Sequence, residues 1–209
     1  MNMSGLIFAM EMIGVIAFAI SGVFVAKEKH MDYFGAVVLG CATACGGGVV
    51  RDLILGVTPP AMFRDPIYVI AAFITATLVF ILEYKKVQLP AEDSWILNVA
   101  DSIGLGVFVV VGSQAAIYEG FQDKFFLCVF VGTVTGVGGG ILRDILACQM
   151  PMVMRKHVYA LAAILGAVVY CIIESTGYEV AASLSGIAVV VLIRMLATIY
   201  RWNLPAFKE

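Results

Sequence analysis

Two copies of one short motif combine residue types that are costly inside an apolar segment. Three glycines are followed, after two apolar residues, by an arginine and an aspartate, at residues 46–52 and again at 138–144. Each glycine weakens a helix by about 1 kcal/mol relative to alanine, and an arginine or aspartate at the centre of a membrane helix costs about 2.5–3.5 kcal/mol on insertion scales. Because the combination occurs twice at one spacing, it predicts a shared functional role.

The glycine trios support two interpretations. In the first, each helix breaks at its trio, and the freed carbonyl and amide groups line a watery cavity. In the second, the glycines only let neighbouring helices approach closely. We favour the break, because packing motifs usually space small residues by four instead of placing them side by side. The predicted break and pore positions are Gly46, Gly47, Gly48, Gly138, Gly139 and Gly140.

The charges of the motif need partners, because lipid solvates them poorly. They could set the electric field along a pore or latch a gate, or they could be ion pairs that fix helix register. Both roles can hold together. The residues concerned are Arg51, Asp52, Arg143 and Asp144.

Each copy of the motif is preceded by another apolar segment with an acidic residue near its start. This residue is Glu11 before the first copy and Asp101 before the second. We expect ion pairs Glu11–Arg51 and Asp101–Arg143, direct or through water, with the aspartate of each motif as a further partner. The alternative is that loop carbonyls and groups of the same helix hold each arginine.

Hydroxyl and thiol groups inside the apolar segments are weaker candidates for groups that bind an ion. Ser21, Thr43 and Thr135 could replace part of the hydration shell of a permeating ion, or they could bond the backbone of their own helices. Cys41 and Cys45 would share a helix face, but no histidine or carboxylate is close in sequence, so packing is favoured over metal binding. No metal site and no cofactor are expected.

The segments that carry these residues are those of a membrane protein. Of the 209 residues, 62% are hydrophobic and only 13% are charged, with a net charge of −2. This composition cannot form a water-soluble surface, and it offers no basic surface for nucleic acid. With flanking residues, each uncharged window approaches the roughly 20 residues of a membrane-spanning helix. The windows are Met12–Ala26, Tyr33–Val50, Pro66–Leu82, Ser102–Tyr118, Phe125–Leu142, Val158–Ile173 and Val180–Ile193.

These windows predict an all-α integral membrane protein with seven transmembrane helices in one domain, residues 1–209. A unit of three spans occurs twice, at about 5–86 and at about 95–175. The seventh helix, at about 180–200, has no counterpart. Since three is odd, equivalent helices of the two copies cross the membrane in opposite directions, as in channels and secondary transporters with a site between inverted halves. Small residues near the start of the seventh helix suit close packing within or between subunits.

Loop charges predict the orientation in a plasma (inner) membrane. Most basic loop residues fall on one side, and the other side offers chiefly Arg64 and Lys124. By the positive-inside rule, the N-terminus is outside and the C-terminus cytoplasmic. The basic residues assigned to the cytoplasmic side are Lys27, Lys29, Lys85, Lys86, Arg155, Lys156, Arg201 and Lys208.

The doubled Gly-Gly-Gly-x-x-Arg-Asp motif, the early acidic residues and the 3+3+1 arrangement together resemble the prokaryotic TRIC family of trimeric intracellular cation channels, over essentially the whole chain. Glu11 stands where this family would lead us to expect aspartate. The resemblance implies a homotrimer with one pore in each subunit, broken second and fifth helices, and conduction of monovalent cations, chiefly potassium and also sodium.

Three classes of function were weighed. The first is a potassium-preferring cation channel with its pore between the two halves of each subunit. The alternative is a secondary transporter for a small solute of the glycine type, which would use the same central cavity, because the bacterial domain is also labelled a glycine transporter. An enzyme is not expected, since the sequence has no His-Glu-x-x-His pattern and the repeat accounts for the aspartates of the motif.

Overall fold

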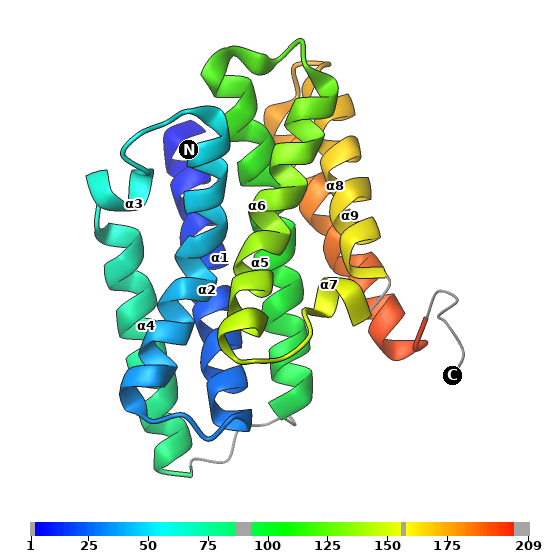
Figure 1. Cartoon of the computed structure of the whole chain (residues 1–209). Coiled ribbons are helices and arrows are strands. Elements are labelled where there is room, and N and C mark those ends of the chain that lie inside the picture. Colours follow the sequence, from blue (N-terminus) through cyan, green and yellow to red (C-terminus); the bar gives the residue numbers. More distant parts are fainter. Residues whose placement is uncertain (1–2, 87–92, 156–157, 203–209) are drawn as a thin grey trace.

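A computed structural model of the chain describes residues 3–86, 93–155 and 158–202. Lys156 and Lys208, two of the basic residues used for the orientation, lie outside these ranges. The described residues form helices joined by short turns (Figure 1). In chain order the helices are α1 (Met3–Glu28), α2 (Tyr33–Leu55), α3 (Ala61–Arg64), α4 (Ile67–Tyr84), α5 (Asp93–Ala116), the π-helix η1 (Ile117–Phe121), α6 (Phe125–Leu146), α7 (Met152–Arg155), α8 (Val158–Glu174) and α9 (Glu179–Ile199).

Local signals account for the ends of α2. The carboxylate of Asp32 accepts a hydrogen bond from the backbone N–H of Gly35 at 2.7 Å, which satisfies one of the free amides of the first turn. At the other end Gly56 has φ +74°, a left-handed conformation that glycine adopts without steric cost. The helix is therefore capped at both ends by residue types suited to those positions.

Six helices in the described part of the chain are long and apolar enough to cross a membrane. They are α1, α2, α4, α5, α6 and α9, and α8 is a shorter apolar helix of 17 residues. Each of the windows predicted from the sequence lies largely within one of these helices. The all-helical membrane architecture is confirmed.

The long helices form two groups of three. Helices α1, α2 and α4 contact one another, as do α5, α6 and α8, and the groups meet along α1–α5 and α2–α6. Figure 1 shows α1 and α5 running in opposite directions, and likewise α2 and α6, and α4 and α8. Helix α9 packs mainly on α8 and α5, so it extends the second group, and among the described residues the first group has no equivalent helix.

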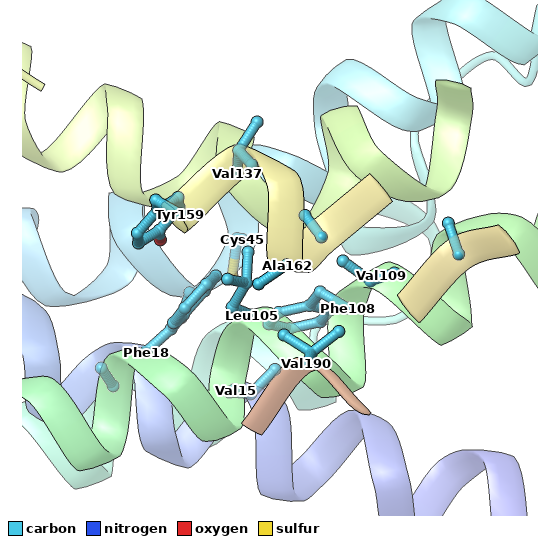
Figure 2. Packing of buried hydrophobic residues seen from close by; sticks show 14 of the residues in the cluster. Val15, Phe18, Cys45, Leu105, Phe108, Val109, Val137, Tyr159, Ala162 and Val190 are labelled. Atoms are coloured by element: carbon cyan, nitrogen blue, oxygen red, sulfur yellow. The ribbon is translucent and has the colours of Figure 1, made fainter. Parts of the chain in front are cut away.

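Aromatic rings pack closely where the two groups meet, and Figure 2 shows Phe18 and Phe108 among the buried hydrophobic side chains there. The rings of Phe18 and Phe108 lie 5.2 Å apart between centroids, one from α1 and one from α5. Each ring packs against a glycine of the opposite helix, Phe18 on Gly104 and Phe108 on Gly14. A methyl group at Gly104 would overlap the Phe18 ring, and one at Gly14 would press on Phe108 and its neighbour Val107. Both rings are almost completely buried, so they form a closed apolar layer at the centre of the molecule.

Candidate functional site

The expected helix breaks at Gly46–Gly48 and Gly138–Gly140 are not present. Helix α2 is continuous from Tyr33 to Leu55, and α6 from Phe125 to Leu146. No glycine of either trio has positive φ. The prediction that these helices unwind was wrong.

The glycines are used for close contact between α2 and α6 instead. A Cβ atom at Gly47 would overlap the carbonyl oxygen of Thr135, and one at Gly139 would overlap the carbonyl oxygen of Thr43. These reciprocal contacts exclude any side chain at the crossing point. A Cβ at Gly48 would meet nothing nearer than the Arg51 guanidinium, at 3.9 Å. Within one trio, therefore, one glycine is required by packing and its neighbour is not.

The Arg-Asp pair that follows each trio makes the same contacts in both copies. Arg51 Nε donates to Asp52 Oδ1 at 2.8 Å, and Arg143 Nε donates to Asp144 Oδ1 at 2.9 Å. The second carboxylate oxygen of each aspartate accepts the first backbone N–H of the next short helix at 2.7 Å, that of α3 in one copy and α7 in the other. The motif therefore fixes the end of a long helix against the start of a short one.

In the second copy the arginine also joins α6 to both central helices. Arg143 Nη1 donates to Asp101 Oδ1 on α5 at 2.7 Å and to the hydroxyl of Ser21 on α1. The side chains of Arg143, Asp101 and Asp144 are fully buried. The expected proximity of Asp101 and Arg143 is thus present, and the pair is shielded from water.

Arg194 of α9 belongs to the same cluster and was missed by the sequence analysis. Its Nη2 atom donates to Asp101 Oδ2 at 3.3 Å, and its guanidinium carbon lies 4.5 Å from the centre of the Tyr159 ring. The predicted window for the seventh span ended at Ile193, so this arginine was not considered. An arginine inside an apolar helix needs a partner, and that requirement could have revealed it.

In the first copy Glu11 and Arg51 form no direct ion pair, although both line one cavity, so a pair through water stays a prediction. Glu11 Oε2 accepts instead from the hydroxyl of Tyr68 on α4, at 2.5 Å. Among the described residues, the ion-pair partner of Arg51 is Asp52, the neighbour on its own helix. Tyr68 and Tyr159 are equivalent in the repeat, since each is the second residue of its helix and lies four residues after an arginine. In the first copy this tyrosine therefore supplies the direct hydrogen bond to the acidic residue.

A cavity of about 80 Å³ lies beside this first cluster. Glu11, Asp52, Arg51 and Tyr68 supply its polar lining, and Gly48 and Phe108 form part of the rest. The volume is enough for several water molecules or a partly hydrated cation. One guanidinium faces two carboxylates here, so the lining carries a formal charge of −1 when all three are ionised. The site can therefore attract a cation.

The hydroxyl groups proposed to line a pore do not face this cavity. Thr43 donates to the carbonyl oxygen of Leu39 and Thr135 to that of Val131, both at 2.6 Å and both one turn earlier in the same helix. Both threonines are fully buried, and their carbonyl oxygens lie at the α2–α6 crossing. Ser21 is also buried, against Arg143. For Thr43 and Thr135 the alternative, a bond to the backbone of their own helices, is thus present, and a pore-lining role of the three hydroxyls stays a prediction.

The cavity and the buried cluster lie on opposite sides of the phenylalanine layer. Along α1, Phe18 stands between Glu11 of the first cluster and Ser21 of the second. Along α5, Phe108 lines the cavity, and Asp101 lies two turns away in the buried cluster. Polar groups thus continue on both sides of an apolar constriction. The cysteines are free thiols, and no group of three potential metal-ligating side chains occurs within the described ranges.

The family described as "Glycine transporter" matches the chain twice, at residues 8–84 and 98–175. The first range contains most of α1 and all of α2 to α4, and the second contains most of α5 and all of η1 to α8. The two matches correspond to the two copies of the repeated motif.

Curated relatives of similar length are described as membrane proteins. A UPF0126 membrane protein of Vibrio cholerae is 40% identical over 205 residues, which cover 98% of this chain and 84% of the relative. The UPF0126 inner membrane protein YadS of Escherichia coli K12 is 38% identical over 205 residues, 97% of this chain and 96% of the relative. These alignments span nearly the whole molecule.

Solved structures with the same fold are cation channels. A TRIC trimeric intracellular cation channel orthologue from Rhodobacter sphaeroides superposes with a TM-score of 0.87 at 31% identity, covering 94% of this chain and 99% of the other. A second structure, described in terms of conductance through TRIC cation channels, has a TM-score of 0.83 at 36% identity and covers 96% of this chain and 97% of the other.

Proposed function

The chain belongs to the TRIC family of membrane proteins, and we propose that it is a potassium-preferring channel for monovalent cations with one pore inside each subunit. One observation carries this proposal. A cavity with a net negative lining lies within the first of two similar three-helix groups and is bordered by Phe108 of the second, and another charged cluster lies beyond the phenylalanine layer. Negative lining favours cations over anions at such an entrance.

The membrane arrangement proposed for this pore is the inverted 3+3 repeat with an added seventh helix. It is supported by the doubled family match, the equivalent Arg-Asp contacts and the opposite directions of α1 and α5. Helix α8 would be the sixth crossing, since 17 residues extend about 25 Å and flanking residues can supply the remainder. The repeats would then occupy about 5–86 and 95–175, with the N-terminus outside and the C-terminus in the cytoplasm of a plasma (inner) membrane.

The pathway would run from the Glu11 cavity, past the α2–α6 crossing, to the cluster around Asp101. In the conformation described, Phe18 and Phe108 close its middle, and Arg143 closes the far side by holding α1, α5 and α6 together. An apolar constriction blocks ions because water leaves it. Conduction would therefore require the rings to separate and Arg143 to release at least one of its partners.

The proposed assembly is a homotrimer, as in the structural relative described as trimeric. An apolar groove of about 460 Å³ between α1 and α5, lined by Ile13, Ile16, Trp95 and neighbouring residues, is a suitable contact for another subunit. Native mass spectrometry of the protein in detergent tests this. A monomer or dimer as the dominant species would contradict it.

Flux through liposomes that contain the purified protein tests the function itself. We expect a membrane potential that follows the potassium gradient. The potassium flux should not saturate with concentration as the flux through a carrier does. Saturable counterflow of labelled glycine, without an ionic current, would instead favour the small-solute transporter. Empty liposomes and liposomes with heat-unfolded protein are the controls.

A further inference from the structure

The second charged cluster contains a side chain from outside the repeat, Arg194 of α9, that has no counterpart in the first cluster. In the first, Glu11 is bonded to Tyr68 at 2.5 Å, and no lysine or arginine of the described residues forms an ion pair with it. In the second, the corresponding Asp101 carries two arginines, Arg143 at 2.7 Å and Arg194 at 3.3 Å. Arg194 comes from α9, the helix outside the repeats.

This difference changes the charge of the clusters. In the first, the single guanidinium of Arg51 faces two carboxylates, which leaves a formal charge of −1 beside a cavity. In the second, two guanidiniums face two carboxylates in a fully buried site, so the formal charge is zero. The neutral cluster thus holds a second guanidinium beside its acidic residue, whereas the negatively charged cluster borders a cavity.

Arg194 is held in the way that a bound cation would be held. Its guanidinium lies over the face of Tyr159, the repeat counterpart of Tyr68, at 4.5 Å. It makes one long hydrogen bond to Asp101, and its buried Nε has no hydrogen-bond partner among the described residues. The contact thus relies on charge and ring attraction more than on a complete set of directed hydrogen bonds.

We propose that Asp101 and Tyr159 form a monovalent-cation subsite that the guanidinium of Arg194 fills as a tethered cation, equivalent to a subsite at Glu11 and Tyr68 that stays open to free cations. This inference rests on the proposed cation pathway, but binding can be tested without measuring flux. Removing the Arg194 side chain should vacate the subsite, and a free cation should then replace it.

The experiment is chemical rescue of Arg194→Ala, followed by thermal unfolding of the purified protein in detergent. Potassium chloride, low-millimolar guanidinium chloride and N-methylglucamine chloride are compared at equal ionic strength. For the variant we expect guanidinium and potassium to raise the melting temperature by about 3–6 °C at about ten times their dissociation constants. The bulky N-methylglucamine should give no such rise. The rise in the variant should exceed that in the wild type, where free cations can occupy only the subsite at Glu11 and Tyr68.

Two further variants identify the charge as the cause. Arg194→Lys keeps a tethered cation, so its response to potassium should equal that of the wild type. Asp101→Asn combined with Arg194→Ala removes both charges and should abolish the added response. Equal stabilisation of Arg194→Ala by all three salts would overturn the proposal.

Loss of folding is itself informative. If Arg194→Ala does not fold, the double variant with Asp101→Asn should restore folding, because the unpaired carboxylate would be the cause. A double variant that also fails to fold would overturn the tethered-cation role in favour of packing. Wild-type protein without ion flux, combined with rescue of the variant by potassium, would reject the channel and keep the subsite, whereas normal flux without rescue would reject the subsite alone.

Discussion

Two arginines in equivalent positions of the repeat have different surroundings. Arg143 is fully buried and shares hydrogen bonds with Asp101, Asp144 and Ser21. Arg51 bonds Asp52 and borders the cavity. Removing one member of a buried ion pair leaves the other charge without compensation, and water can compensate such a charge only where it has access.

We therefore expect Arg143→Gln to destabilise the protein by about 3–5 kcal/mol, and Arg51→Gln by about 1–3 kcal/mol. Denaturant unfolding in detergent micelles measures both free energies. Adding Asp101→Asn to Arg143→Gln should recover part of the loss, since the stranded carboxylate is then neutral. Equal costs for the two arginines, or strictly additive effects in the double variant, would contradict this account of the burial.

Glu11 should act on permeation more than on stability. Its carboxylate lines the cavity, and no arginine or lysine of the described residues forms a direct ion pair with it. Glu11→Gln is expected to lower potassium conductance about two- to tenfold, for a lost attraction on the order of 1 kcal/mol at a partly solvated site. The exposed Glu119, near the same end of the bundle, provides the control, since Glu119→Gln removes an equal charge outside the cavity. Similar conductance losses in both variants would attribute the effect to general surface charge.

The helices themselves show which features the sequence could predict. Long uncharged windows were sufficient to locate α1, α2, α4, α5, α6, α8 and α9, because only a helix satisfies its own backbone in lipid. The role of the glycine trios was not predictable in the same way. A glycine that permits a bend and a glycine that permits contact look alike in one chain, and only the position of the Thr135 carbonyl distinguishes them at Gly47. Likewise, no local pattern relates Arg194 to Asp101, which lies 93 residues earlier.

The crossing of α2 and α6 gives a sharp comparison within one trio. Gly47→Ala should destabilise the protein by about 1–3 kcal/mol or more, because its methyl group would overlap the carbonyl oxygen of Thr135 and push the helices apart. Gly48→Ala should be neutral or stabilising by up to about 1 kcal/mol, because its methyl group has space and alanine favours the helix. Thermal unfolding and potassium flux are measured for both variants. A tolerated Gly47→Ala would mean that the contact between α2 and α6 is not required.

At the level of the whole molecule, α9 makes the two halves unequal. It covers α5 and α8, where Val190 packs on Gly166, and Gly186 contacts Val110 and Tyr170. The small residues at its start therefore serve contact within the subunit. In the part of the chain that the structure describes, no helix covers the first half in this way, and its outer helix α4 is only slightly buried along its length. The open cavity lies in the half without such a cover, and the buried cluster lies in the half that α9 covers. The added helix can therefore account for the difference in burial between the two clusters.

The charges at the two ends of the bundle allow a test of its orientation. Helices α1, α4 and α6 end at the same end of the molecule in Figure 1, which places Lys27, Lys85 and Cys148 together there. Glu119 in η1 lies at the opposite end. By the positive-inside rule, the lysine-rich end faces the cytoplasm.

Labelling with a membrane-impermeant maleimide should therefore modify Cys148 in inverted membrane vesicles and leave it unmodified in intact cells. Cys148 is an exposed native thiol, whereas Cys45, Cys128 and Cys171 are buried and should react slowly in either preparation. The matched variant combines Glu119→Cys with Cys148→Ala and should give the opposite result, with labelling in intact cells. The two positions lie at opposite ends of one bundle. If the N-terminus is cytoplasmic, both results must therefore be reversed, with Cys148 labelled in intact cells and residue 119 labelled in inverted vesicles. Labelling of both positions from the same side would show that the chain does not cross the membrane between them in the way proposed.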